Sequence, residues 1–390
     1  MFGKGLRIFK LFGFEVRIDA SWLILAVLII LSLSSGYFPF HYKDLSTRAY
    51  AIMGVVGAIG LFASIIIHEM CHSLVGRRYG VPMHGITLFM FGGVAQMDQE
   101  SKTPKAEFVM AIAGPIASFI LAGAFYLLYL GLKPMAPTTI AGVIRYLAWI
   151  NVILAIFNLI PAFPLDGGRI LRAGLWAGKG NLRWATRIAA RIGAGFGIVL
   201  IVLGIMALLG GSLVGGLWWC LLGMFLRGIS HASYQQLLVR DTLSGESVER
   251  FIRKDPVTVP SNLSLADLLE NYIYEYHYKM FPVVDDGELR GAVSTRQVKD
   301  VPREKWERTT VGEVAEKPSE SNSIKADTDA SQALEQIKKT GNSRLLVVDG
   351  GKLEGIVTLR DMIDFLALKL DIEDNDSQAR NLQEKLRQAG

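Results

Sequence analysis

The feature that most constrains the fold of this chain is a series of long apolar runs that contain no acidic residue, lysine or arginine. The hydrocarbon core of a bilayer is about 30 Å thick, so a helix needs roughly 20 apolar residues to cross it. Four runs have about this length, and a longer fifth run is interrupted by glycine pairs at 210–211 and 215–216, which favours two helices joined by a short turn. The five runs are Ala20–Tyr42, Ala49–His68, Phe108–Leu132, Tyr146–Leu165 and Ile192–Leu226. The sequence therefore predicts six transmembrane helices.

Charged residues divide the chain into an apolar part and a polar part. Residues 1–240 contain 20 Lys and Arg and 8 Asp and Glu, whereas residues 241–390 contain 21 and 28. Because 51% of the chain is hydrophobic and its two cysteines lie in apolar segments, Cys71 just after the second run and Cys220 inside the fifth, the composition excludes a disordered protein and a disulfide-stapled scaffold. The positive excess lies between the apolar runs, where membrane orientation explains it. We therefore expect the lipid bilayer as a partner and no nucleic acid.

The distribution of Lys and Arg between the apolar runs predicts the orientation in the membrane. Six crossings place both termini on one side. The segments on that side, 1–17, 77–105 and 169–191, contain 4, 4 and 6 Lys and Arg, whereas the three opposite loops contain 2, 2 and 0. Cytoplasmic loops are the ones enriched in Lys and Arg. We therefore expect a multi-pass protein of the cell membrane with cytoplasmic N- and C-termini.

The second apolar run leads into the sequence His68-Glu69-x-x-His72. Residues four apart lie on one face of a helix, so the two imidazoles can chelate one metal ion, while Glu69 can act on a water molecule beside it. A catalytic zinc site needs a third protein ligand, and Asp166 is the only acid between residues 108 and 240. The alternatives are polar side chains that snorkel at a helix end and an aspartate that caps the next helix.

Two motifs resemble those of a known family, the site-2 protease family of intramembrane zinc metalloproteases, in the group that carries C-terminal CBS domains. They are His68-Glu69-x-x-His72 in one predicted span, and Asn158-x-x-Pro161 followed by Leu165-Asp166-Gly167 in another. The resemblance covers nearly the whole chain. It implies that His68, His72 and Asp166 bind one Zn²⁺ per subunit and that Glu69 is the catalytic acid and base.

A third motif departs from the family pattern at one position. Gly114-Pro115-x-x-Ser118 is similar to the family's Gly-Pro-x-x-Asn, with Ser118 where many members have Asn. Whether this position has a polar role is left open by the sequence.

Candidate substrate-binding residues come from two places. Residues 84–97 are apolar, broken by glycines and too short to cross a bilayer. They resemble the family's membrane-associated β-hairpin, whose edge could pair with an unwound substrate; an interfacial loop is the alternative. From this segment we take Phe91, Gly92 and Gly93 as candidates. Asn158 is a candidate donor to the substrate backbone or the developing oxyanion.

The polar part contains an internal repeat. Residues 281–294 parallel residues 345–358, and each copy has a strand, a glycine turn and a second strand. A stretch with helical periodicity precedes each copy, at 265–276 and at 330–339. The repeats resemble a tandem pair of CBS domains, which bind adenine nucleotides such as ATP or AMP in the cleft between them.

The same resemblance implies which residues would contact a nucleotide. The family's ribose-contacting Ser/Thr-x-x-Asp is present as Thr358-Leu-Arg-Asp361, but the first copy has Ser294-Thr-Arg-Gln297 and lacks the acid. A carboxylate accepts two ribose hydroxyls better than an amide does. We therefore expect one nucleotide site rather than two; the alternative is a structural pair that forms a homodimer.

Together these features predict one fold class, a multi-span α-helical membrane protein with six transmembrane helices and a C-terminal soluble α/β tandem CBS domain. The predicted domains are a metalloprotease domain at 1–240, CBS repeats at 241–305 and 306–371, and a polar tail at 372–390. The predicted function is an intramembrane zinc endopeptidase that cleaves a single-pass membrane protein in its transmembrane segment near the cytoplasmic face, under regulation by adenine nucleotide. The alternative function is a membrane transporter or channel regulated by the CBS pair.

Overall fold

The computed structural model describes residues 6–373 apart from residues 12, 82, 91 and 98–100. The chain forms two compact units, residues 1–234 and 235–390. The division falls inside a helix, and the domain boundaries expected at 240, 305 and 371 stay predictions. All but the first two residues of the polar tail expected at 372–390 lie outside the described residues.

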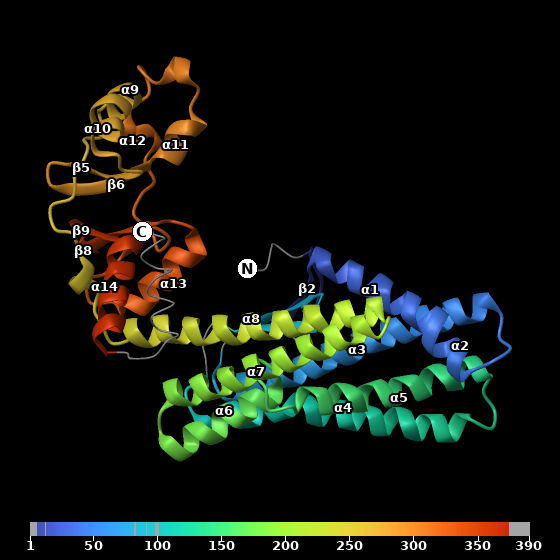
Figure 1. Ribbon diagram of the computed structural model, residues 1–390. Helices are drawn as coiled ribbons and strands as arrows, with labels where there is room; N and C mark the ends of the chain where they lie inside the picture. Colours follow the sequence, from blue (N-terminus) through green and yellow to red (C-terminus); the bar gives the residue numbers. More distant parts are fainter. Residues whose placement is uncertain (1–5, 12, 82, 91, 98–100, 374–390) are drawn as a thin grey trace. The chain divides into compact units, whose positions relative to one another are not determined.

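Unit 1 consists of long helices and one small sheet (Figure 1). The helices are α1 (Ala20–Ser32), continued by a π-helical turn (Leu33–Tyr37) and α2 (Phe38–His41), then α3 (Thr47–Arg78), α4 (Pro104–Leu132), α5 (Thr138–Asn158), α6 (Asp166–Lys179), α7 (Leu182–Leu209) and α8 (Leu213–Leu243). Six helical segments among the described residues are long and apolar enough to cross a membrane, with α1 to α2 forming one of them. The prediction of six spans is confirmed, including the turn that divides the fifth apolar run into α7 and α8.

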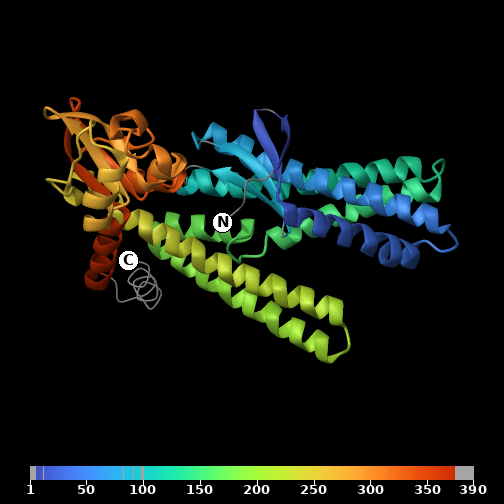
Figure 2. The same ribbon diagram turned by 90° about the horizontal axis from the view of Figure 1, so that it is seen from above.

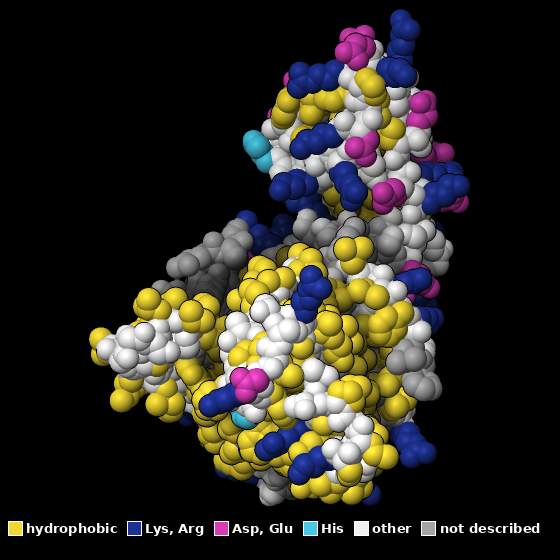
Figure 3. Space-filling view, turned by 90° about the vertical axis from the view of Figure 1, so that its right-hand side faces the viewer, with side chains coloured by type: hydrophobic (Ala, Val, Ile, Leu, Met, Phe, Trp, Pro, Cys, Tyr) yellow, Lys and Arg dark blue, Asp and Glu magenta, His cyan; other side chains and the backbone are white. Residues whose placement is uncertain are grey.

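The outer surface of the helices is apolar, as a lipid environment requires. Leu127 and Met206 are 69% and 62% exposed, whereas small residues such as Ala111 and Ala155 are fully buried between helices. Figure 3 shows hydrophobic side chains covering much of one face of unit 1. Because lipid tails offer no hydrophobic driving force for association, such helices depend on close packing of small residues.

Capping residues fix where the spans begin. The hydroxyl of Ser46 accepts a hydrogen bond from the backbone N–H of Ala49 at the start of α3, and Thr103 does the same for Ala106 at the start of α4. Helix α3 then continues to Arg78, well beyond the apolar run that predicted it. As a result His68 and His72 lie within the helix, not at its end as expected from the sequence.

The sheet of unit 1 has four strands in the order β1 (Leu6–Leu11), β2 (Phe14–Ile18), β3 (Met83–Phe89) and β4 (Gly92–Met97). Strands β3 and β4 are antiparallel, which confirms a hairpin in the segment 84–97 and excludes the alternative of an irregular loop there. Strand β2 pairs in parallel with β3. The two N-terminal strands were not expected, although Phe14 and Val16 alternate with Glu15 and Arg17 and are buried.

Unit 2 contains short helices and two small sheets. After a 3₁₀ turn (Val248–Phe251) its helices are α9 (Leu265–Leu268), a π-helical turn (Leu269–Ile273), α10 (Tyr274–Tyr276), α11 (Thr295–Asp300), a second 3₁₀ turn (Arg303–Lys305), α12 (Val311–Val314), α13 (Ala330–Thr340) and α14 (Leu359–Glu373). Its strands are β5 (Met280–Asp285), β6 (Glu288–Ser294), β7 (Ser323–Ile324), β8 (Arg344–Asp349) and β9 (Lys352–Thr358). Strands β5 and β6 form one sheet, and β7, β8 and β9 form the other.

The two hairpins of unit 2 confirm the internal repeat in detail. Each is antiparallel, and its register shifts at the corresponding position, between Val283 and Val284 in the first copy and between Val347 and Val348 in the second. Each copy has its own buried core, one containing Val283 and the other Val347. Because the register shift occurs at the same position of both hairpins, the two copies repeat in backbone geometry as well as in sequence.

Helices α7 and α8 lie side by side in both views (Figures 1 and 2) because two glycines let their backbones meet. A Cβ on Gly197 would lie 2.6 Å from the carbonyl oxygen of Gly223, and a Cβ on Gly223 would lie 2.4 Å from that of Gly197. By contrast, Gly195 on the outer face of α7 has nothing within 4 Å.

We predict opposite effects for one added methyl group at two positions of α7. Gly197→Ala should lower the free energy of unfolding by about 1–3 kcal/mol, because α7 and α8 must separate. Gly195→Ala should raise it by up to about 1 kcal/mol, because alanine restricts the unfolded chain. Thermal unfolding of the detergent-solubilised chain measures both, and equal effects at the two positions would contradict the packing described.

The carboxylate of Asp329 caps α13 and also connects it to the chain after α8. It accepts hydrogen bonds from the backbone N–H of Ser331 at 2.8 Å, from the Ser331 hydroxyl at 2.5 Å and from the backbone N–H of Gly245 at 2.7 Å. Partial burial raises the pKa of Asp329, whereas these hydrogen bonds lower it. The lowering effect is the larger one, so the pKa lies below its ordinary value.

We predict an acid-dependent loss of stability that depends on Asp329. A lowered folded-state pKa stabilises the fold above the unfolded value of about 3.9, and this contribution is lost as the pH falls through the folded-state pKa. Asp329→Ala should remove about 1 kcal/mol at pH 7 and flatten the decline below pH 4. The thermal midpoint measured from pH 7 to pH 3 tests this, with the exposed Asp327→Ala as the control that should change neither value.

Candidate metal centre

Helix α3 places two histidines on one buried face. His68 and His72 are each 3% exposed, and their ring centroids are 4.8 Å apart. This follows from the helical period of 3.6 residues, which aligns residues four apart. Glu69, one residue along, projects about 100° away around the helix and is only partly buried.

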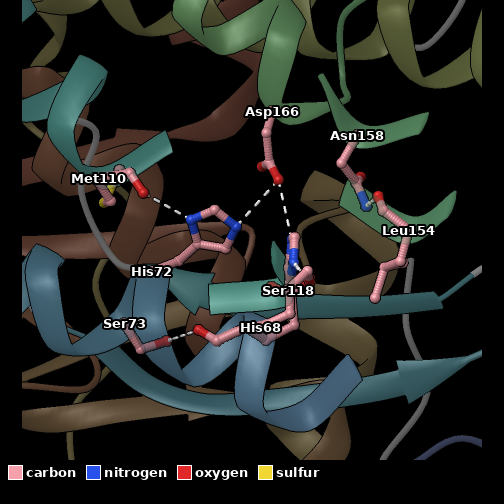
Figure 4. Close-up of polar contacts among 9 residues, drawn as sticks. His68, His72, Ser73, Met110, Ser118, Leu154, Asn158 and Asp166 are labelled. Atoms are coloured by element: carbon pink, nitrogen blue, oxygen red, sulfur yellow. Dashed lines mark hydrogen bonds and ion pairs between the residues drawn. The ribbon is translucent and has the colours of Figure 1, made fainter. Parts of the chain in front are cut away.

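The chain leaves its helical path before the third candidate ligand. Helix α5 ends at Asn158, residues 159–165 are irregular and contain two prolines, and α6 begins at Asp166. The Oδ2 atom of Asp166 lies 3.0 Å from Nε2 of His68 and 3.2 Å from Nε2 of His72 (Figure 4). The capping position of α6 is occupied by Leu165, and Asp166 is the first residue of the helix itself, so Asp166 is not the N-cap that the alternative required.

Helix α4 orients both imidazoles from the other side. The Nδ1 atom of His68 lies 2.9 Å from the Ser118 hydroxyl, and Nδ1 of His72 donates to the Met110 carbonyl oxygen at 2.6 Å (Figure 4). With Nδ1 engaged, Nε2 is the nitrogen that each ring turns toward Asp166. Such outer partners fix ring orientation and raise ligand basicity in metal sites. Ser118 therefore fills the polar role that the sequence left open.

A glycine of α4 leaves the space at the centre of this cluster. A Cβ on Gly114 would lie 2.2 Å from Nε2 of His72 and 2.6 Å from Nε2 of His68. Any larger residue would occupy the volume into which both Nε2 atoms point.

The three groups fit a metal ion. Among the described residues, His68, His72 and Asp166 form the one group of three or more ligating side chains, with ligand atoms within 4.8 Å of one another. A tetrahedral zinc ion with bonds of about 2.0 Å separates its ligand atoms by roughly 3.3 Å. The 3.0 and 3.2 Å separations are close to this value, and the donor set of two imidazoles and one carboxylate suits zinc.

Two further contacts hold the segment that carries Asp166. Arg172 of α6 and Glu107 of α4 form an ion pair in which both side chains are almost fully buried. The Ser230 hydroxyl of α8 donates to the Phe163 carbonyl oxygen at 2.5 Å, three residues before Asp166. Since breaking a buried pair costs about 3–5 kcal/mol, Glu107 and Arg172 resist any displacement of α6 from α4.

The candidate substrate-binding residues do not join this cluster. The side-chain amide of Asn158 donates to the Leu154 carbonyl oxygen at 2.9 Å on its own helix (Figure 4). Gly92 and Gly93 begin β4, which lies at one edge of the sheet. Phe91 lies outside the described residues.

In unit 2, the candidate nucleotide residues lie at the start of α14. The Thr358 hydroxyl donates to Oδ2 of Asp361 at 2.5 Å, and Arg253 donates to both oxygens of Asp361. A cavity of about 690 Å³ opens beside them, with Arg253, Arg344 and Thr358 in its wall. In the first repeat, Gln297 instead closes a capping box with Ser294.

Comparisons with known proteins agree with this arrangement. The sequence pattern of peptidase family M50 matches residues 56–138 and 133–203, and that of the CBS domain matches residues 248–304 and 311–368. A Mycobacterium tuberculosis protein named Rip3, described as a zinc metalloprotease, is 34% identical over 90% of both chains. Zinc metalloprotease MJ0392 of Methanocaldococcus jannaschii is 30% identical over 95% of this chain and 99% of its own length.

A solved structure, the site-2 protease from Methanocaldococcus jannaschii, is 29% identical, with a TM-score of 0.41 over 57% of this chain and 95% of its own. The identity and coverage of the two full-length relatives show the family. This chain is a multi-pass membrane member of peptidase family M50, the site-2 protease family, and it carries a C-terminal pair of CBS domains.

Proposed function

We propose that this protein is an intramembrane zinc endopeptidase that cleaves a transmembrane segment of a single-pass membrane protein near the cytoplasmic face. The observation that carries this proposal is the approach of one Asp166 oxygen to Nε2 of both His68 and His72, across 98 and 94 residues of sequence, respectively. The membership in a family of zinc metalloproteases supports the same conclusion.

In this proposal His68, His72 and Asp166 hold the zinc ion and Glu69 moves the proton. A zinc ion held there would polarise the scissile carbonyl and lower the pKa of a water molecule to about 7. The Glu69 carboxylate takes a proton from the attacking water and later gives it to the nitrogen of the leaving amine. The side-chain amide of Asn158 uses one N–H in its hydrogen bond to the Leu154 carbonyl oxygen. Its second N–H can donate to the substrate backbone.

A helical substrate must unwind before it can react, because its carbonyls are engaged in backbone hydrogen bonds. We propose that the edge strand β4, which begins with Gly92 and Gly93, pairs with the unwound segment, and that Phe91, the preceding residue in the sequence, takes part in binding. An edge strand offers unpaired backbone groups to an extended peptide. The distribution of Lys and Arg supports a position of this strand and of the metal centre on the cytoplasmic side.

A transporter or channel is the competing function for a membrane protein with CBS domains. Transport pathways commonly place ionisable residues through the depth of the membrane. In this sequence no acid lies between Glu107 and Asp166, and Asp166 lies beside a chelating histidine pair. Clustering at one depth favours hydrolysis over transport.

We predict that metal binding and cleavage separate in single variants. His68→Ala and His72→Ala should each remove most of the zinc, normally one ion per chain. Glu69→Gln should retain zinc while cleavage falls by about 10²–10⁴-fold, because only the proton transfer is lost. Elemental analysis of the purified chain gives the zinc content, and a reconstituted single-pass substrate gives the cleavage rate.

Cys71→Ser is the matched control on the same helix, since Cys71 is a free thiol that is not among the three ligating side chains. It should retain both zinc and activity. Loss of zinc in this control, or undiminished cleavage by Glu69→Gln, would contradict the assignment.

We also propose that the cavity of unit 2 binds one adenine nucleotide and that the CBS pair can form a homodimer. Thr358 and Asp361 would hold the ribose, and the cationic wall formed by Arg253 and Arg344 would face the phosphates. Arg253 already forms an ion pair with the Asp361 carboxylate. The ribose hydroxyls must therefore either share this carboxylate with Arg253 or displace the arginine from it.

We predict that Asp361→Asn weakens ATP binding to the full chain about tenfold, since one charge-assisted hydrogen bond contributes about 1.5–3 kcal/mol. Gln297→Ala, at the matching position of the first repeat, should change the affinity less than twofold. Isothermal titration calorimetry measures both. Equal losses in the two variants would show two sites, and no loss in either would remove the proposed ribose contact.

A further inference from the structure

A cavity of about 580 Å³ lies on the outer surface of unit 1, away from the residues of the metal centre. Phe119 and Tyr126 of α4 line it together with Arg145 and Trp149 of α5, and His41 at the end of α2 closes one side. Its volume falls within the range of roughly 300–1,000 Å³ that is typical of sites for small molecules.

The walls of this cavity face the lipid. Phe119, Tyr126 and Trp149 are 43%, 54% and 56% exposed, and they lie on helices long and apolar enough to span the membrane. Tyr and Trp gather where the hydrocarbon meets the headgroups, because their rings are apolar and their N–H and O–H groups are polar. A ligand of this cavity therefore has both an apolar and a polar part.

One charge in the cavity has no ion-pair partner among the described residues. Arg145 lies seven residues into α5, about 10 Å from the start of the helix. Its guanidinium neighbours the Tyr42 side chain, and in the described part of the chain it takes part in no ion pair. The sequence from 108 to 165 contains no acid at all. An arginine at this depth needs an anion or access to the headgroup region.

The surroundings of Arg145 add to its positive potential. Residues 39–50 at this end of unit 1 contain Lys43 and Arg48 against Asp44 as their single acid. Figure 3 shows basic side chains scattered over this mostly hydrophobic face. His41 stacks with Tyr37 at a centroid distance of 4.3 Å, which holds its ring at the cavity wall.

We propose that this cavity binds the headgroup of an anionic phospholipid, with the phosphate paired to Arg145 and the acyl chains along the exposed faces of α4 and α5. The planar guanidinium binds phosphate oxygens in a bidentate manner. The lipid-facing aromatic walls select a phosphate that carries acyl chains over a free phosphate ion. This site is separate from the proposed catalysis and does not depend on it.

Native mass spectrometry of the full chain tests the proposal with phosphatidylglycerol and phosphatidylcholine of identical acyl chains. Wild type should retain phosphatidylglycerol at least fivefold more than phosphatidylcholine. Arg145→Gln should abolish this preference, while Arg145→Lys keeps part of it. The matched control is Lys133→Gln at the same end of the unit, where Lys133 lies over the Tyr129 ring; it should retain the full preference.

Three results would overturn the proposal: equal retention of the two lipids by wild type, an unchanged preference in Arg145→Gln, or displacement of the lipid by millimolar inorganic phosphate. The last would identify a site for small anions.

A second measurement needs no change at Arg145. In reconstituted bilayers, phosphatidylglycerol with brominated chains should quench the fluorescence of Trp149 more than brominated phosphatidylcholine does at the same mole fraction. The contribution of Trp149 is the difference between wild type and Trp149→Phe. Equal quenching by the two lipids would also refute the site.

Discussion

The structure of unit 1 depends on one carboxylate oxygen that lies between two buried imidazoles. Asp166 is 8% exposed inside a bundle whose outer surface is apolar, where an uncompensated charge would be costly. In the proposed centre, a divalent cation held by all three side chains would balance that charge. Under the proposed function, the electrostatics of burial and the chemistry of hydrolysis would require the same ion at the same point.

Helix α4 provides no ligand and yet determines the geometry of the centre. Met110, Gly114 and Ser118 are spaced by four residues and lie on one face of the helix. The first and third orient the two imidazoles, and the second leaves the space between them. The buried pair Glu107–Arg172 then ties α4 to the helix that begins with the aspartate. A metal centre of this kind is a property of three packed helices rather than of one motif.

Much of this could be predicted from the sequence because helical periodicity and the cost of charge in lipid are local rules. They predicted the six spans, and they singled out His68, His72 and Asp166 as residues the fold should bring together. The role of Met110 has no such signal, because a backbone carbonyl looks the same in every residue. The strand Phe14–Ile18 could have been predicted from its alternation of apolar and charged residues. The charged residues of this segment were instead used only to predict the orientation in the membrane.

The most direct test of the metal centre is X-ray absorption spectroscopy at the zinc edge on the purified, zinc-loaded chain. The account predicts a first shell of nitrogen and oxygen at about 2.0 Å, with the multiple scattering of two imidazoles. Asp166→Asn should change the oxygen contribution and leave both imidazoles in place. A sulfur neighbour at about 2.3 Å, or scattering from a single imidazole, would contradict the account.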